Sequence, residues 1–164
     1  MGRGDRPGRG GPWVALLVGV TLLGPGSATI ILPGLPAAAR EFSVSYGEIQ
    51  WVVSLHLLGI AASVIFVGPA SDRLGRRNVL IGGLAMFVLG SLVSFLAGSL
   101  WILILGRLIQ SIGNGASVLI PRVLVRDTMT GNDAARTMAI LVGATAIAPA
   151  LAPVPPVVID TVAG

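Results

Sequence analysis

The sequence contains no cysteine and no lysine, and it has a single histidine, His56. Without cysteine the chain can form neither a disulfide nor a thiolate metal site, and it offers no thiol nucleophile. The histidine and the seven scattered carboxylates show no grouping with the spacing of metal ligands, so we expect no metal and no cofactor. Charged residues are also scarce, at 11% against about 25% in soluble domains.

Apolar residues are correspondingly abundant, and they make up 54% of the 164 residues. A soluble fold of this size could not hide so much apolar surface. The composition therefore predicts an all-α membrane protein in contact with the lipid bilayer. The arginines stand between apolar blocks rather than in a basic run with aromatics, so we expect no nucleic-acid partner.

Five apolar stretches are long enough to cross about 30 Å of hydrocarbon, which takes roughly 20 helical residues. These predicted spans cover residues 13–33, 49–70, 79–97, 100–121 and 137–159. Residues 1–11 are rich in glycine and arginine, and we expect them to be disordered. The first span follows three arginines as a signal peptide would, but it is too long for one and further spans follow it. We interpret it as a retained helix.

The arginines are distributed unevenly over the predicted turns. Nine of them fall on one side of the predicted helices and only Arg40 falls on the other. Because cytoplasmic loops are enriched in basic residues, the nine mark the cytoplasmic side. We therefore expect a multi-pass protein of the inner (plasma) membrane, with a cytoplasmic N-terminus.

The segment 68–80 lies between the second and third predicted spans and combines glycine with charge. Gly68 and Gly75 permit a tight reversal and close helix contact. Asp72 lies near the water boundary, and three arginines follow it within five residues: Arg73, Arg76 and Arg77. Such a cluster can exchange partners between two conformations. The alternative is an ordinary positively charged loop that contains one aspartate.

Arg107 lies about a third of the way into the fourth predicted span. An arginine at membrane depth costs about 2.5–3.5 kcal/mol and usually faces a bundle interior or a water-filled cavity. The alternative is a side chain that extends to the outer interface. His56, within the second span, is either a proton relay or a neutral imidazole bonded to a neighbouring helix, and we favour the second interpretation.

The order of residues in 68–77 resembles the loop signature of the major facilitator superfamily, G-x-x-x-D-R-x-G-R-R. Residues 103–113 resemble the same family's fourth-span motif, L-x-x-x-R-x-x-Q-G-x-G, with Ser111 in place of the first glycine. Residues 121–127, the run 134–139 and the segment 31–41 are similar to the bicyclomycin/chloramphenicol-resistance type of drug:proton antiporters.

This resemblance implies that residues 12–164 form part of the N-terminal six-helix bundle of such a transporter. It implies small amphipathic substrates exchanged for protons, with Arg107 and Gln110 as candidates for proton coupling. It makes the segment 68–77 a conformational-switch loop, and Pro149 and Pro153 the remnant of a fifth-span antiporter motif. The first-span position where the subfamily commonly has aspartate is Thr29, which cannot carry a proton.

The family has at least twelve spans in two halves, so we infer a truncated chain that needs a C-terminal half. The alternative function is a non-transporting membrane fragment, or an assembly partner of another chain. We expect no enzyme activity, because only Arg107 and His56 are ionisable within the predicted spans and catalysis needs groups that converge.

Overall fold

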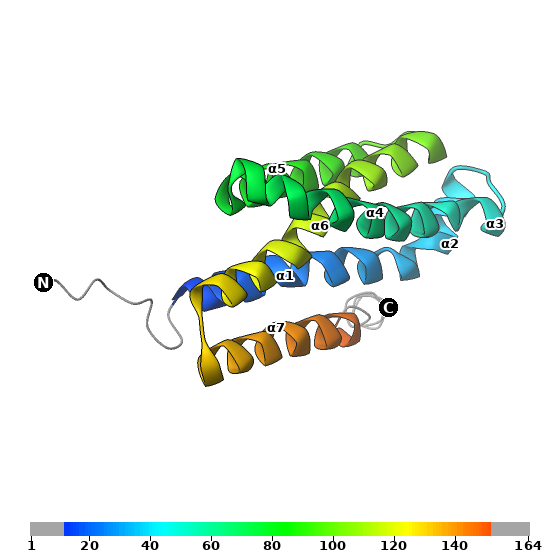
Figure 1. The fold of residues 1–164 in the computed structure, drawn as a ribbon. Coiled ribbons are helices and arrows are strands. Elements are labelled where there is room, and N and C mark those ends of the chain that lie inside the picture. Colours follow the sequence, from blue (N-terminus) through cyan, green and yellow to red (C-terminus); the bar gives the residue numbers. More distant parts are fainter. Residues whose placement is uncertain (1–11, 152–164) are drawn as a thin grey trace, which may run out of the picture.

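The computed structural model describes residues 12–151, and within them every regular element is a helix (Figure 1). The elements in chain order are α1 (Pro12–Ile30), η1 (Leu32–Gly34), α2 (Leu35–Glu41), α3 (Tyr46–Ile49), α4 (Trp51–Leu74), α5 (Arg76–Phe95), α6 (Leu100–Thr128) and α7 (Gly131–Leu151). The predicted all-α membrane fold is confirmed.

Four helical stretches among the described residues are long and apolar enough to cross a membrane: 13–41, 46–74, 76–95 and 100–128. They overlap the first four predicted spans. The first, second and fourth extend beyond the prediction, because hydropathy marks only the residues in hydrocarbon while backbone hydrogen bonding continues into the headgroup layer. The third, 76–95, begins three residues before and ends two residues before the predicted 79–97. α7 begins six residues before the fifth predicted span, 137–159, whose last part lies outside the described residues.

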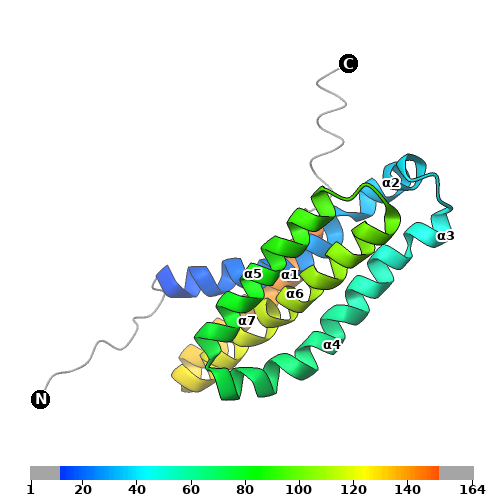
Figure 2. The same ribbon diagram turned by 90° about the horizontal axis from the view of Figure 1, so that it is seen from above.

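α6 is the central helix of the bundle. α4 and α5 pack against it on one side and α1 on the other, and α7 lies along α1 (Figures 1 and 2). In the stretch that could span the membrane, 61% of α6 is buried against 11% of α5. Side chains on α6 are therefore the ones that can contact several helices at once.

Glycines set the distance between α5 and α6. A Cβ atom on Gly90 of α5 would lie 2.6 Å from the Gly106 carbonyl oxygen and 2.7 Å from the Gln110 Cα, both on α6. Backbone atoms cannot move aside as a flexible side chain can, so only glycine fits there. Membrane helices depend on such close approaches, because lipid gives their apolar faces no hydrophobic reason to associate.

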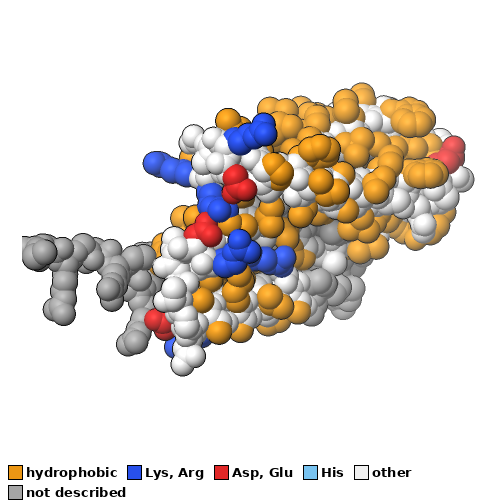
Figure 3. Space-filling view, in the orientation of Figure 1, with side chains coloured by type: hydrophobic (Ala, Val, Ile, Leu, Met, Phe, Trp, Pro, Cys, Tyr) orange, Lys and Arg blue, Asp and Glu red, His pale blue; other side chains and the backbone are white. Residues whose placement is uncertain are grey.

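The molecule carries many apolar side chains on its surface (Figure 3) and several polar ones inside. Phe95 is 85% exposed and Phe66 is 73% exposed, whereas the buried set includes several polar residues. The fully or nearly buried polar residues of the described chain are Thr21, His56, Ser63, Ser71, Arg107, Gln110, Ser111, Asn114, Ser117 and Thr137. This arrangement suits a lipid solvent, where the polar groups must find partners within the bundle.

Charged residues gather at the two ends of the bundle. One end, which we call the arginine-rich end, carries the charged side chains grouped at the left in Figure 3, contributed by the α4–α5 and α6–α7 turns. The opposite end holds the α2–α3 turn and the α5–α6 turn, with Glu41 and Glu48 on the first of these segments. The apolar band between the two ends is the part that contacts lipid.

Candidate functional site

Arg107 points into the bundle rather than to an interface. Its side chain is 8% exposed, and its NH1 group donates to the Ser27 carbonyl oxygen at 3.1 Å and to Gln110 Oε1 at 2.9 Å. The guanidinium thus joins α6 to α1, and Nε has no partner among the described residues. Of the two interpretations of this residue, the geometry fits the interior position.

The position of Ser27 explains how α1 holds this cation. Ser27 lies in the last turn of α1, and the helical path continues from there through η1 into α2. A carbonyl oxygen has two lone pairs, so that of Ser27 can accept from Arg107 as well as from a backbone N–H. Arg107 therefore gains an acceptor on α1.

Gln110 extends the network to a third helix. Its Nε2 group donates to Ser91 Oγ on α5 at 2.7 Å while its Oε1 accepts from Arg107. Beside these side chains lies a cavity of about 390 Å³, lined by Ser27, Phe87, Arg107, Gln110 and three residues of α1: Leu22, Leu23 and Gly26. The two residues expected to couple protons are thus brought together, and both line one cavity.

His56 and Asn114 form a second branch of the network. Nδ1 of His56 lies 2.9 Å from the Arg107 carbonyl oxygen, and Nε2 lies 3.2 Å from Nδ2 of Asn114, which also donates to Ser27 Oγ at 2.9 Å. An amide donor at Nε2 and a carbonyl acceptor at Nδ1 match a neutral imidazole with its proton on Nδ1. The position fits the favoured interpretation, a buried imidazole bonded to a neighbouring helix.

Three members of this network were not singled out from the sequence: Ser27, Ser91 and Asn114. Ser27 and Ser91 lie on α1 and α5, so no local pattern links them to Arg107, whereas Asn114 lies on α6 seven residues after Arg107 and on the same face. Asn114 carried one usable signal, since an amide in the middle of a span must find a partner inside the bundle. Thr29, the position where aspartate was expected, donates to the Pro25 carbonyl of its own helix at 2.7 Å.

The predicted switch segment is mostly helical. α4 continues through Asp72 and Arg73 to Leu74, α5 begins at Arg76, and only Gly75 lies between them, with φ +84°. Gly68 lies inside α4 rather than in a loop. The sharp reversal that the two glycines suggested is therefore made at Gly75 alone, since a positive φ is readily adopted only by glycine.

Arg76 is the charged residue of this segment that contacts another helix. Its Nε donates to Asp127 Oδ2 of α6 at 2.7 Å, and its NH2 lies 3.4 Å from Asp72 Oδ1. The Asp127 pair is the shorter and the less exposed of the two, so it is the stronger contact. Asp72, with a side chain 69% exposed, is a weakly held alternative partner. Asp127 was not among the residues assigned to the switch.

The predicted fifth-span prolines fall at the limit of the description. Pro149 lies within α7, but nothing is described of its side chain, and Pro153 lies outside the described residues. Among the described residues no group of three or more potential metal ligands occurs.

Comparison with known proteins gives two findings. Residues 17–160 match the sequence model of the Major Facilitator Superfamily. The multidrug resistance protein MdtL of Escherichia coli strain HS and that of Shigella boydii are each 34% identical to this chain over 135 residues. The match covers 82% of this chain and 34% of each relative, so the chain spans about a third of the length of the relatives it matches.

Proposed function

Because this chain belongs to the major facilitator superfamily, we propose that it forms part of a secondary carrier that exports small amphipathic molecules in exchange for protons. The chain is a multi-pass membrane protein. In this proposal it lies in the plasma membrane, with the arginine-rich end in the cytoplasm. The names of its multidrug resistance relatives support the class of substrate.

The observation that carries the proposal is the buried charge of Arg107 beside the cavity of about 390 Å³. Helix carbonyl and amide oxygens hold this guanidinium, and among the described residues no carboxylate forms an ion pair with it. Its positive charge is therefore not neutralised by an ion pair, and it acts on any ion in the cavity. Two unit charges 4 Å apart interact by about 4 kcal/mol at an effective dielectric constant of 20. Near Arg107, a bound proton would therefore weaken the binding of a cationic substrate, and a bound substrate would weaken the binding of the proton. An antiporter needs this linkage.

Proton coupling in this proposal involves Arg107 and Gln110 rather than the first span. Neither residue carries the proton, since a guanidinium stays protonated and an amide does not titrate, so their role is to transmit its charge. Thr29 cannot take up a proton, and the described carboxylates all lie near helix ends: Glu41, Glu48, Asp72, Asp127 and Asp133. Gln110 orients the guanidinium toward α1 and ties it to α5. A change in the charge near Arg107 is thereby transmitted to three helices.

The segment with Gly68, Asp72, Arg73, Gly75, Arg76 and Arg77 serves as the conformational switch in this proposal. Arg76 reaches both Asp127 on α6 and Asp72 on its own segment, so it can pass from one carboxylate to the other as the helices shift. An exposed pair of this kind contributes only about 0–1 kcal/mol, which is small enough to exchange readily.

Transport in a chimera tests the carrier proposal. The segment of MdtL that this chain matches is replaced by the corresponding residues of this chain, and export of a fluorescent amphipathic dye is measured in inverted vesicles with an imposed proton gradient. We expect the chimera to transport and its Arg107→Ala variant to lose at least about tenfold in rate, as befits an ion at membrane depth. Arg40→Ala, an exposed arginine outside the network, is the matched control. Equal export by all three proteins would remove Arg107 from the mechanism.

A second candidate function is a membrane segment that acts only together with another polypeptide. The 164-residue chain is expressed alone and together with the remaining two thirds of MdtL. Export only when both are present would support the assembly partner, whereas export by the chain alone would exclude it.

A further inference from the structure

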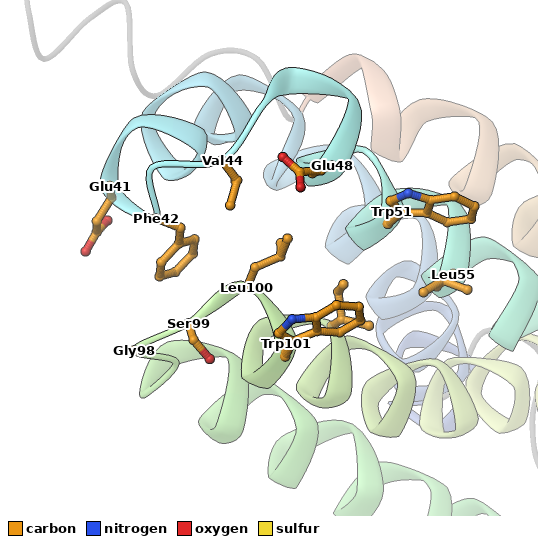
Figure 4. Close-up of a pocket in the computed structure, with 11 residues that line it drawn as sticks. Glu41, Phe42, Val44, Glu48, Trp51, Leu55, Gly98, Ser99, Leu100 and Trp101 are labelled. Carbon is orange, nitrogen blue, oxygen red and sulfur yellow. The ribbon is translucent and has the colours of Figure 1, made fainter.

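A second cavity, of about 750 Å³, lies at the end of the bundle opposite the arginine-rich end (Figure 4). Three segments enclose it: the α2–α3 turn, the start of α4, and the α5–α6 turn with the start of α6. Its volume is within the range of about 300–1,000 Å³ that is typical of small-molecule sites. It shares no lining residue with the Arg107 cavity, so it requires its own explanation.

Two carboxylates lie on the wall of this cavity. Oε2 of Glu48 accepts from the Ser45 backbone N–H at 2.8 Å and from Ser45 Oγ at 2.7 Å, in the reciprocal capping box that begins α3. The box fixes the position of the carboxylate, and Oε1 has no hydrogen-bond partner among the described residues. Glu41 ends α2 on the same wall, whereas Arg40 does not line the cavity.

Aromatic rings from separate elements face the same space. Trp51 at the start of α4 is 58% exposed, Trp101 at the start of α6 is 77% exposed, and Phe42 adds a third ring from the α2–α3 turn (Figure 4). Tryptophan is common at membrane interfaces, which explains the depth of each ring. It does not explain why the rings converge on one cavity together with two carboxylates.

The α2–α3 turn is built in an unfavourable backbone conformation. Ser43 has φ +54°, and it is the non-glycine residue with positive φ in the described chain. The residues on either side of it, Phe42 and Val44, both line the cavity. This conformation closes the C-terminus of α2, because the Val44 N–H bonds the Ala39 carbonyl oxygen and the Ser43 N–H bonds the Arg40 carbonyl oxygen, as in a Schellman motif.

We propose that this cavity binds an amphipathic nitrogen cation. The cationic head lies against Glu48, on the side of the cavity where Trp51 and Trp101 also lie, so that carboxylate charge and the ring faces both attract it. The apolar body lies along Leu100, Leu55 and the tryptophan rings. Either a soluble amphiphile or the ethanolamine headgroup of a membrane lipid has this chemistry. The inference does not depend on the carrier proposal, because it needs no transport step.

Quenching of tryptophan fluorescence tests the site in the full chain, purified in dodecyl maltoside micelles, which contain no cation. A Trp13→Phe background leaves Trp51 and Trp101 as the only reporters. Dodecylpyridinium, whose ring quenches tryptophan on contact, is titrated below its micellar concentration. We expect saturable quenching. Glu48→Gln should weaken it by about fivefold, the limit set by one partly exposed ion pair.

The variant is chosen so that folding is preserved, since glutamine at this position also completes a capping box. Asp133→Asn, which removes a carboxylate from the arginine-rich end, is the charge-matched control and should bind like the parent. Displacement of the probe by phosphatidylethanolamine, but not by phosphatidylglycerol, would identify a lipid headgroup as occupant, and no displacement would identify a soluble amphiphile. Quenching that never saturates, or that is equal in Glu48→Gln and the parent, would overturn the site.

Discussion

Among single residues, Arg107 carries the largest electrostatic cost in the described part of the chain. Burying an arginine at span depth costs about 2.5–3.5 kcal/mol. Hydrogen bonds to a charged group return about 1.5–3 kcal/mol each, and Arg107 makes two, to Ser27 and Gln110. The network therefore roughly offsets the insertion cost, and the residue is held without a carboxylate.

Asn114 is the donor on which the second branch of this network depends. We expect Asn114→Leu to lower the free energy of unfolding by about 1–2 kcal/mol, because Ser27 Oγ and His56 Nε2 both lose a donor inside the bundle. Circular dichroism during titration with sodium dodecyl sulfate measures the change. Ser117→Ala is the control, since the Ser117 hydroxyl bonds only the Asn114 carbonyl of its own helix. Equal stability of the two variants would contradict the network.

Gly75 is a residue whose identity the backbone conformation dictates. Its φ of +84° and ψ of +139° are almost restricted to glycine, so we expect Gly75→Ala to cost about 1–3 kcal/mol of unfolding free energy. Gly98→Ala is the control, because Gly98 lies in the other turn with open space around it and no positive φ. The same detergent titration compares the two variants. A Gly75→Ala protein as stable as Gly98→Ala would show that the turn can rearrange.

At the scale of elements, the sequence predicted the order of the long helices but not where they end. The number and order of the first four long helices followed from the lengths of the apolar runs, because hydrocarbon thickness fixes the length of a span. Helix ends did not follow. α6 continues to Thr128 rather than stopping at 121, and α4 and α5 meet at Gly75, since hydrogen bonding does not stop where hydrophobicity does.

The candidate site was predicted in part for a related reason. Arg107 stood out because a charge interrupts an apolar run, and Gln110 stood out through the family motif. Ser27 and Ser91 could not be recognised, because serine is ordinary in a membrane helix and its role here comes from distant helices. Asp127 was missed because its contact with Arg76 depends on α6 continuing past residue 121, which hydropathy did not predict.

The pair α5 and α6 offers a test at the level of helix packing. We expect Gly90→Ala to lower the unfolding free energy by about 1–3 kcal/mol, because its Cβ would meet the Gly106 and Gln110 backbone and force the helices apart. Gly82→Ala on the same helix meets nothing within 4 Å and should be neutral or slightly stabilising, since alanine favours helix. Thermal unfolding in dodecyl maltoside measures both. Equal losses would mean that helix propensity, not contact, decides the result.

At the scale of the whole molecule, the uneven distribution of arginine predicts how the bundle lies in the membrane. We expect alkaline phosphatase fused after Gly98 to be active, because the α5–α6 turn would face the outside. Fusion after Thr130 should be inactive, because that turn belongs to the arginine-rich end. Fusions of a fluorescent protein that matures only in the cytoplasm should give the reverse pattern. Activity of the phosphatase at both positions would contradict the proposed orientation.

The central place of α6 has a consequence for how this protein is made. α4 and α5 leave the ribosome before α6, yet both pack mainly on α6 and little on each other. Until α6 has been synthesised, Gly83 and Gly90 of α5 have no helix to pack against. The earlier helices therefore lie in the bilayer without their main packing partner. Assembly of the bundle during biosynthesis is therefore timed by the arrival of its fourth long helix.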